Sequence, residues 1–264
     1  MPDSKPRIDP ETAPPTSETI RTLLDRVSVR KYADKPVDDA TVDAVLRAAF
    51  RAPTSSNIQA YSVVVVRDGD TLAELAPVTG NQKHVADAPV FLAFCADLTR
   101  IARAMADRGH DVDPNNLEMG LVSSIDAALV GMSASLAAES IGLGGVMIGA
   151  VRNDAVRTAE ILGLPHHVYC VFGMVLGWPA EAPKQKPRMA FEGMVHRERY
   201  GNMPGAPDTA PSVASYDAAL SAHYGTVGKQ TTPDSWSHDV DKKFSARPRD
   251  KLREQLAARG FDFR

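Results

Sequence analysis

The chain has 264 residues, of which 44% are hydrophobic and 24% charged, and its formal net charge at pH 7 is -3. Such a composition is typical of a globular protein with an ample core, and the charge balance gives no basic field that would indicate nucleic-acid binding. No continuous apolar run approaches the roughly 18 residues that a membrane span needs, so no membrane association is expected.

The N-terminal stretch MPDSKPRIDPETAPPTSE is rich in proline and lacks the apolar region of a signal peptide. We expect residues 1–17 to be a disordered or loosely attached tail, and residues 18–264 to form one domain with a C-terminal arm from about residue 189. Cys95 and Cys170 each lie inside an apolar run. They are expected to be free buried thiols, which indicates a protein of the reducing cytoplasm.

The first hundred residues predict three helices and two strands, with the third helix and a loop in TLAELAPVTGNQKHVADA, between the two strands. A short helix covers residues 17–27, and a second helix, capped by Asp38 or Asp39, follows it. The strands cover residues 62–66 and 89–96. Both are continuous apolar runs, which is typical of strands covered on both faces.

A long helix is predicted over residues 116–141, and it is apolar most of the way round. Such a helix usually lies at the centre of a large domain or in a dimer interface. Its stripe of large apolar residues consists of Val122, Ile125, Leu129, Met132 and Leu136. Apolar strands over residues 144–151 and 168–177 follow, with a short helix between them.

The region after Trp178 is rich in proline and charge. Two helices with modest apolar faces are predicted there, over residues 213–223 and 249–259, and such segments often wrap around a partner subunit. Helices and apolar strands alternate upstream of this region, with connections of variable length. The sequence therefore predicts an α/β fold with a central sheet between helices, and with a C-terminal arm.

Cations on two extended segments are the first candidate site. In RVSVRKY, Arg26, Ser28 and Arg30 alternate with valines, and residues two apart in an extended segment face the same way. Lys186 and Arg188 share a face of QKPRM, because the proline between them keeps the backbone extended. Two such faces, if they converge, suit a phosphate, but two solvated strand edges would have the same spacing.

Three further features bear on ligands. Thr54, Ser55 and Ser56 suit helix caps and turns, and they equally suit hydrogen bonds to a polyol or phosphate. Gly149 lies within a predicted strand, where glycine costs stability unless a group such as a flat ring approaches the backbone. The chain has no GxGxxG fingerprint that opens a helix and no Walker A sequence, the two common nucleotide-binding motifs. It also has no clustered Cys/His spacing, so no metal site is predicted.

Five motifs in order resemble the FMN-dependent nitroreductase family, and most closely its oxygen-insensitive NADPH nitroreductase and flavin reductase group. They are RVSVRKY, APTSSNIQAYSVVVV, GNQKHVADAPVFLAFCAD, AAESIGLGGVMIGAVRND and FGMVLGWPAEAPKQKPRM. The resemblance implies a homodimeric α/β (α+β) sandwich with a mixed, largely antiparallel sheet and one FMN in each of two interface sites. It further implies an oxidoreductase that passes hydride from NADPH or NADH through the flavin to nitroaromatics, quinones or free flavin.

The resemblance also implies cofactor-binding roles for single residues. Arg26 and Ser28 match the phosphate-binding segment, Arg30 the cation near the flavin N1 and O2 edge, and Lys186 and Arg188 the Lys-Pro-Arg that closes over the phosphate. The other matches are a hydroxyl loop contributed across the dimer (Thr54, Ser55, Ser56), a glutamine facing the flavin (Gln82), and the strand whose backbone approaches the ring (Ile148, Gly149, Ala150). Hydride transfer needs no protein nucleophile or general base, so no catalytic side chain is expected.

Departures from the group leave two questions open. Val27 stands where members of the group carry a second basic residue. Members also carry C-terminal arginines that grip the 2′-phosphate of NADPH, whereas HYGTVGKQTTPDSW keeps only Lys229 as a basic residue. The donor is therefore either NADH, or NADPH with Lys229 as a substitute. The acceptor is equally open, since a specialised flavoenzyme for another substrate, or a flavin-binding protein without nitroreductase turnover, would share these motifs.

Overall fold

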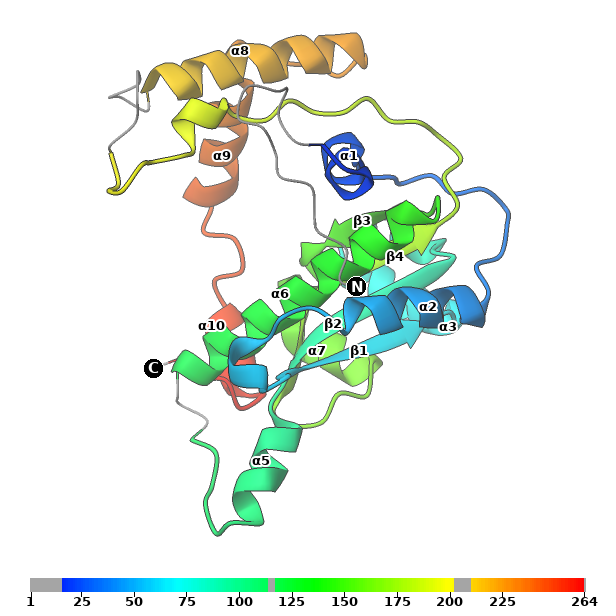
Figure 1. Ribbon diagram of the computed structural model, residues 1–264, viewed down its shortest axis with the longest axis vertical. Helices are drawn as coiled ribbons and strands as arrows, with labels where there is room; N and C mark the ends of the chain where they lie inside the picture. The colour runs from blue at the N-terminus through cyan, green and yellow to red at the C-terminus, as the bar shows by residue number, and fades with distance from the viewer. Residues whose placement is uncertain (1–15, 114–116, 202–209, 264) are drawn as a thin grey trace, which may run out of the picture.

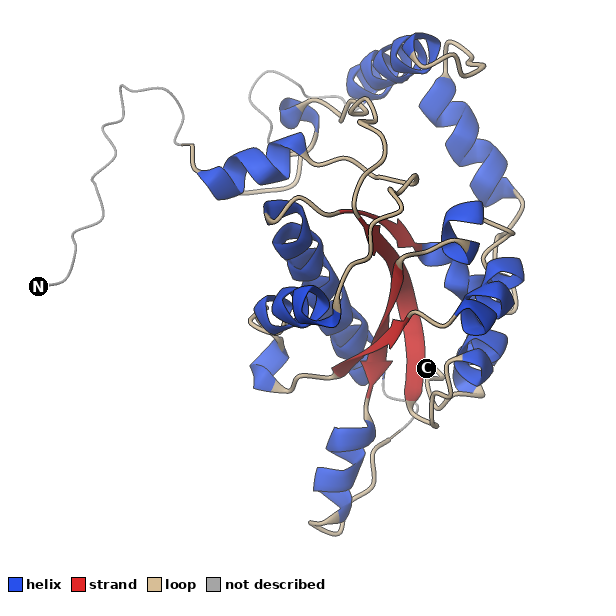
Figure 2. Cartoon of the chain, turned by 90° about the vertical axis from the view of Figure 1, so that its right-hand side faces the viewer, coloured by secondary structure: helices blue, strands red, loops and turns tan. Residues whose placement is uncertain are grey.

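Four strands form the centre of the molecule, with helices on both sides of the sheet (Figures 1 and 2). The computed structural model describes residues 16–113, 117–201 and 210–263. The strands are β1 (Tyr61–Val66), β2 (Val90–Asp97), β3 (Gly144–Ile148) and β4 (Val168–Gly177), in the order β1-β2-β4-β3. All three pairings between them are antiparallel. The predicted fold class, a sandwich with a largely antiparallel sheet, is confirmed.

Ten helices and three 3₁₀ turns surround the sheet in the described part of the chain. They are α1 (Glu18–Asp25), α2 (Asp39–Ala49), α3 (Gly69–Val78), α4 (Lys83–Ala86), α5 (Thr99–Ala106), α6 (Leu117–Ser140), α7 (Ala155–Ile161), α8 (Ala210–Thr226), α9 (Ser235–Ser245), α10 (Leu252–Ala257), η1 (Ser55–Asn57), η2 (Gly149–Asp154) and η3 (Phe191–Gly193). The sequence analysis did not predict α5 or α9.

The central strand β2 explains why two helical layers are needed. Its side chains alternate between the faces, so that Leu92 and Phe94 pack toward α2 and α6, while Phe91 and Cys95 pack toward α3 and α7. Every residue of β2 is buried, as the continuous apolar run predicted. The same prediction was wrong for β1, which lies at the edge of the sheet and leaves Val65 41% exposed.

The long helix α6 faces the sheet with its small residues and not with its large ones. Ala127, Val130 and Ala134 are fully buried, whereas Ile125 is 55% and Leu129 38% exposed. The predicted stripe of large apolar residues therefore points partly away from the core. By length and hydropathy α6 could cross a membrane. However, 50% of its most apolar stretch is buried against the rest of the chain, and a helix packed in a protein core has the same length and composition.

The two ends of the described chain differ in how they contact the rest of the protein. The Ser17 side chain caps α1, where its hydroxyl accepts the N–H of Ile20 at 3.2 Å, and residues 1–15 of the predicted tail lie outside the described residues. Helices α8 and α9 lie away from the sheet in Figure 1, as expected of an arm. The chain then returns to the body at α10, and Phe261 is 2% exposed in a cluster with Tyr169.

One buried carboxylate joins three elements at the end of β2. Asp97 accepts hydrogen bonds from the Ser62 hydroxyl on β1, the Thr99 backbone N–H (2.8 Å) and the Arg100 guanidinium (3.1 Å). Burial alone would raise the pKa of Asp97, but these hydrogen bonds and the Arg100 charge hold that pKa below its ordinary value. The carboxylate therefore stabilises the folded chain above the pKa of an unfolded aspartate, about 3.9, and this stability is lost as the pH falls through the lower folded pKa.

We predict that Asp97→Asn lowers the free energy of unfolding by about 2 kcal/mol near neutral pH, since the amide leaves charged and polar donors poorly paired. The deficit should shrink as urea unfolding is repeated toward about pH 3, because the wild-type carboxyl is then protonated too. Asp107→Asn is the control: Asp107 is 69% exposed and 4.0 Å from Arg103, so it should change stability little. A deficit for Asp97→Asn that is independent of pH would contradict this account.

Candidate functional site

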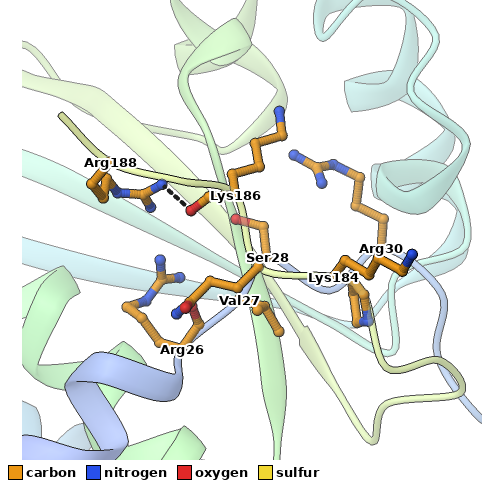
Figure 3. A pocket seen from close by; sticks show the side chains of 9 residues that line it. Arg26, Val27, Ser28, Arg30, Lys184, Lys186 and Arg188 are labelled. Atoms are coloured by element: carbon orange, nitrogen blue, oxygen red, sulfur yellow. Dashed lines mark hydrogen bonds between the residues drawn. The ribbon is translucent and has the colours of Figure 1, made fainter. Parts of the chain in front are cut away.

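Five cations line one small cavity, which we call the cationic cavity (Figure 3). Its volume is about 160 Å³, and it lies between the segment that precedes α2 and the loop that follows β4. Its lining residues are Arg26, Val27, Ser28 and Arg30 from the first segment, and Pro183, Lys184, Gln185, Lys186 and Arg188 from the second. The two faces predicted from the sequence thus converge, and the structure adds Lys184, which spacing alone did not single out.

The first segment is held extended against β3. Ser28 forms an isolated parallel bridge with Gly145, and the Val29 N–H donates to the Gly145 carbonyl at 3.0 Å. A Cβ on Gly144 would lie 2.7 Å from Val29 Cγ2, so this close approach needs a glycine there. Val29 is 3% exposed and anchors the segment, whereas Val27 lines the cavity. Arg26, Ser28 and Arg30 all line the cavity as predicted, but Val27 lines it too, so the segment does not alternate strictly between cavity and core.

The second segment is fastened to the first and to the arm. Gln185 donates from Nε2 to the Arg26 carbonyl at 3.2 Å. The Tyr216 hydroxyl on the arm helix α8 donates to the Pro187 carbonyl at 3.3 Å. In the other direction, the Lys184 ammonium donates to the carbonyl of Thr226, the last residue of α8, at 3.1 Å. These bonds explain how cations about 160 positions apart in the sequence come to share one cavity.

Most of the positive charge in this cavity is not neutralised. Arg26 Nε lies 3.4 Å from Glu139 Oε1, and this Nε is buried without a hydrogen bond. Within the described residues, the other four cations of the cavity are more than 4.0 Å from any carboxylate. Arg30 and Lys186 flank the Ser28 hydroxyl in Figure 3. A phosphate dianion is the group that such a set of forks, point charges and a hydroxyl binds well.

The predicted hydroxyl loop does not line this cavity. Thr54, Ser55 and Ser56 lie at η1, beyond the end of α2, and Asp126 on α6 accepts the Ser55 N–H at 3.1 Å. Their contact with a flavin stays a prediction.

Gln82 is also outside the cationic cavity. It is the N-cap residue of α4, and its side-chain amide donates to the Thr79 carbonyl at 2.7 Å. The nearby His84 lines a second cavity of about 550 Å³ that shares Arg30 with the first. His84 Nε2 is buried without a partner, and burial, followed by the Arg30 charge, lowers the pKa of this imidazole. Sequence reasoning missed His84, since nothing in QKH distinguishes it.

The strand predicted to approach the flavin ring ends earlier than expected. Ile148 is the last residue of β3 and is 2% exposed, while Gly149 and Ala150 begin the turn η2. The placement of Gly149 within a strand was therefore wrong. A Cβ on Gly149 would meet Arg152 Nη2 at an ordinary 3.5 Å, so packing inside the chain does not require glycine there. The Arg152 guanidinium lies beside Gly149 in this chain, and the approach of a flavin to this glycine stays a prediction.

A polar cavity of about 340 Å³ lies in the arm, and we call it the arm cavity. Lys229 lines it, with the Lys229 ammonium 3.8 Å from the centre of the Tyr224 ring. Lys186 of the cationic cavity lies 5.3 Å from the same ring. The arm cavity also contains His238 and Lys242. These two come from α9, as does the Asp239 carboxylate that lines the same cavity, so Lys242 adds a second ammonium beside Lys229 while Asp239 offsets part of the charge.

The two thiols are poor candidates for a second reactive site, and the described residues contain no candidate metal site. Cys95 and Cys170 are free, buried and opposite each other on β2 and β4. The hydrogen bond with Cys170, together with burial, raises the pKa of the Cys95 thiol, which makes it a poor nucleophile. Across residues 16–113, 117–201 and 210–263, no group of three or more His, Cys, Asp or Glu residues could hold a metal ion.

Comparison with known proteins decides the family. The sequence model of the nitroreductase family matches residues 23–178, and that of the family's C-terminal domain matches residues 186–264. The chain belongs to the nitroreductase family. This nitroreductase-family chain is 38% identical over 245 residues to the oxygen-insensitive NADPH nitroreductase of Salmonella typhimurium, covering 93% of the chain and 98% of that relative. The family resemblance inferred from the five motifs is confirmed.

Solved structures of the nitroreductase family have the same fold. The chain is similar to the NfrA1 nitroreductase of B. subtilis, with a TM-score of 0.86 and 34% identity over 94% of this chain and 100% of that one. It is also similar to the NADPH:FMN oxidoreductase from Vibrio harveyi complexed with NAD⁺, with a TM-score of 0.83 and 34% identity over 94% and 100%.

Proposed function

We propose that this chain is an FMN-dependent oxidoreductase that passes hydride from NADPH or NADH to nitroaromatics, quinones or free flavin. The single observation that carries the proposal is the cationic cavity, in which Arg26, Ser28, Arg30, Lys186 and Arg188 meet. These residues fit a flavin mononucleotide because its phosphate needs several charged donors. The names of the relatives support the same reading, since they include an NADPH nitroreductase and an NADPH-flavin oxidoreductase.

The residues of the chain would divide the work of binding. Arg26, Ser28, Lys186 and Arg188 hold the phosphate, and Arg30 provides a positive charge beside the flavin edge that becomes anionic on reduction. When bound, FMN supplies the hydride-accepting and hydride-donating chemistry. The protein then needs only to bind, orient and exclude water, and no side chain acts as nucleophile or general base.

We also propose that the functional unit is a cytoplasmic homodimer formed through α6. Leu121, Ile125 and Leu129 leave an apolar face of this helix exposed, and an exposed apolar face of this kind marks an interface. The hydroxyl loop with Thr54, Ser55 and Ser56 would reach a flavin held by the partner subunit. Gln82, the strand end at Ile148 and the turn residues Gly149 and Ala150 would complete the site beside the flavin ring. The domain would then run from residue 18 to residue 264.

The choice of electron donor is proposed to depend on the arm cavity. Lys229, His238 and Lys242 line it. Lys229 and Lys242 would supply positive charge in place of the arginines that members of the group carry. Equal reduction rates with NADH and NADPH would indicate that this charge does not contact the 2′-phosphate of NADPH.

The test is an anaerobic titration of the purified, FMN-loaded protein with NADH and with NADPH. We predict a yellow protein whose flavin absorbance near 450 nm bleaches on adding the donor and returns when an acceptor is added. A panel of a nitrofuran, a quinone and free FMN then separates a broad reductase from a specialised flavoenzyme, which would reoxidise with none of them. A colourless protein that binds no added FMN would end the proposal. A flavin that neither donor reduces would favour a flavin-binding protein without turnover.

A further inference from the structure

A buried carboxylate fastens both ends of the hydroxyl loop, residues 54–60, to the helix α6. Asp126 is 0% exposed, and a buried charge is tolerated when its oxygens accept hydrogen bonds. Asp126 Oδ1 accepts the Ser55 N–H at 3.1 Å, and Oδ2 accepts the Ala60 N–H at 3.1 Å. One side chain therefore determines where the loop begins and where it ends.

The backbone between these two points has an unfavourable conformation. Ser56, Asn57 and Gln59 have φ angles of 47°, 58° and 55°, which place them in the left-handed region that non-glycine residues rarely adopt. Several such residues in one short loop persist only when the surroundings hold them there. Asp126 and Arg100, which donates to the Gln59 carbonyl at 3.0 Å, are the charged groups that do so.

Asp126 lies next to the exposed apolar face of α6, about 100° round the helix from Ile125. The preceding residue, Ile125, is 55% exposed on the apolar face that we assign to the dimer. Asp126 points inward to the loop. A helix that carries this carboxylate and the interface on neighbouring faces holds the loop at a set position relative to a second subunit.

We propose that Asp126 is a positioning residue of the flavin site, holding the hydroxyl loop in the conformation in which it meets a flavin bound by the partner subunit. This inference rests on the proposed function, because the contact between the loop and the flavin is part of that proposal. Asp126 acts as an acceptor of two backbone N–H groups and does not touch the flavin. No bond is made or broken and no proton moves.

The test compares Asp126→Asn with Ser123→Ala. Asn keeps the shape of Asp126 but turns one acceptor into a donor facing a backbone N–H. Ser123 is 0% exposed on the same helix, and its hydroxyl donates only to carbonyls of α6. We expect Asp126→Asn to raise the Kd for FMN at least about tenfold with unchanged circular dichroism and dimer mass, and Ser123→Ala to leave that Kd within about twofold.

A double-mutant cycle with Ser55→Ala separates positioning from a general loss of stability. If Asp126 acts through the loop, the two substitutions should be non-additive in their effect on the Kd for FMN, because a displaced loop has no hydroxyl contact left to lose. Additive effects would overturn the role. An unchanged Kd in folded Asp126→Asn, with a wild type that binds FMN, would overturn it and leave the proposed function intact. A wild type that binds no FMN removes both.

Hydrogen exchange on the wild-type protein keeps the inference testable if Asp126→Asn does not fold. The Ser55 and Ala60 amides should exchange at least about a hundredfold more slowly than free peptide amides, although they flank a surface loop. Exchange at the free-peptide rate would show that Asp126 does not hold the loop, and would overturn the inference.

Discussion

Arg30→Ala is expected to raise the Kd for FMN by about 10- to 100-fold, because a hydrogen bond to a charged group contributes about 1.5–3 kcal/mol. Arg30 lines both the cationic cavity and the neighbouring cavity with His84. No carboxylate within the described residues neutralises its charge. Its loss should also slow flavin reduction by NADPH or NADH in stopped-flow measurements, since the reduced ring loses a stabilising cation.

Two further variants sharpen the Arg30 prediction. Arg30→Lys keeps the charge but not the planar fork, so its Kd should lie between those of the wild type and Arg30→Ala. Arg21→Ala removes the same charge from the exposed face of α1, outside the lining of the cavity, and should leave the Kd within about twofold. A Kd for Arg30→Ala equal to that of Arg21→Ala would remove Arg30 from the site.

Part of this site could be predicted from local sequence alone. The alternation of Arg26, Ser28 and Arg30 is a property of an extended backbone, and the proline beside Lys186 restricts its neighbours in the same local way. Their convergence could not be derived locally, because it depends on contacts such as that of Gln185, about 160 positions away. The expectation that the two segments meet at one phosphate came from the resemblance to the nitroreductase family.

The long helix shows where hydropathy patterns fail. Its apolar stripe, which includes Ile125 and Leu129, was expected either in the core of a domain or in a dimer interface, and the pattern alone did not decide between them. The side facing the sheet is occupied by small residues. A Cβ on Gly131 would lie 2.3 Å from Phe172 Cζ, so the helix and the sheet are too close there for larger side chains. Residue size, and not hydrophobicity, decides which face is buried. Asp126 was missed for a different reason. The sequence does not show which backbone groups a charged residue in an apolar helix contacts.

The helices of the arm show a second limit. Helix α9 has Lys242 and Lys243 in its last turn and Asp239 and Asp241 before them. Only Trp236, Val240 and Phe244 are apolar in it, at the four-residue spacing of a helix, and this short pattern was missed. The first turn of α9 is fastened by tertiary contacts, because Asp217 on α8 accepts the N–H groups of two residues of α9, each at 2.8 Å. The basic side chains of the arm cavity became visible only once α9 was placed.

Gly173→Ala is expected to be the most destabilising single-methyl change in the sheet. Gly173 lies in β4, paired with Ala93 on one side and Ile148 on the other. A Cβ there would lie 2.1 Å from Cζ of Phe91, which is fully buried and cannot move into solvent. Overpacking of this kind costs about 3 kcal/mol, which corresponds to a fall in Tm of roughly 6–12 °C.

Phe91→Leu tests whether the steric conflict is the cause. Alone, this substitution should destabilise the protein by about 1–2 kcal/mol, since it leaves space above Gly173. In the Gly173→Ala background it should restore stability, because the added methyl then occupies that space, and the two effects will be strongly non-additive. Gly69→Ala is the control, because a Cβ there meets no atom within 4 Å. Additive losses, measured by urea unfolding at one protein concentration, would mean that Phe91 and Gly173 do not share a packing site.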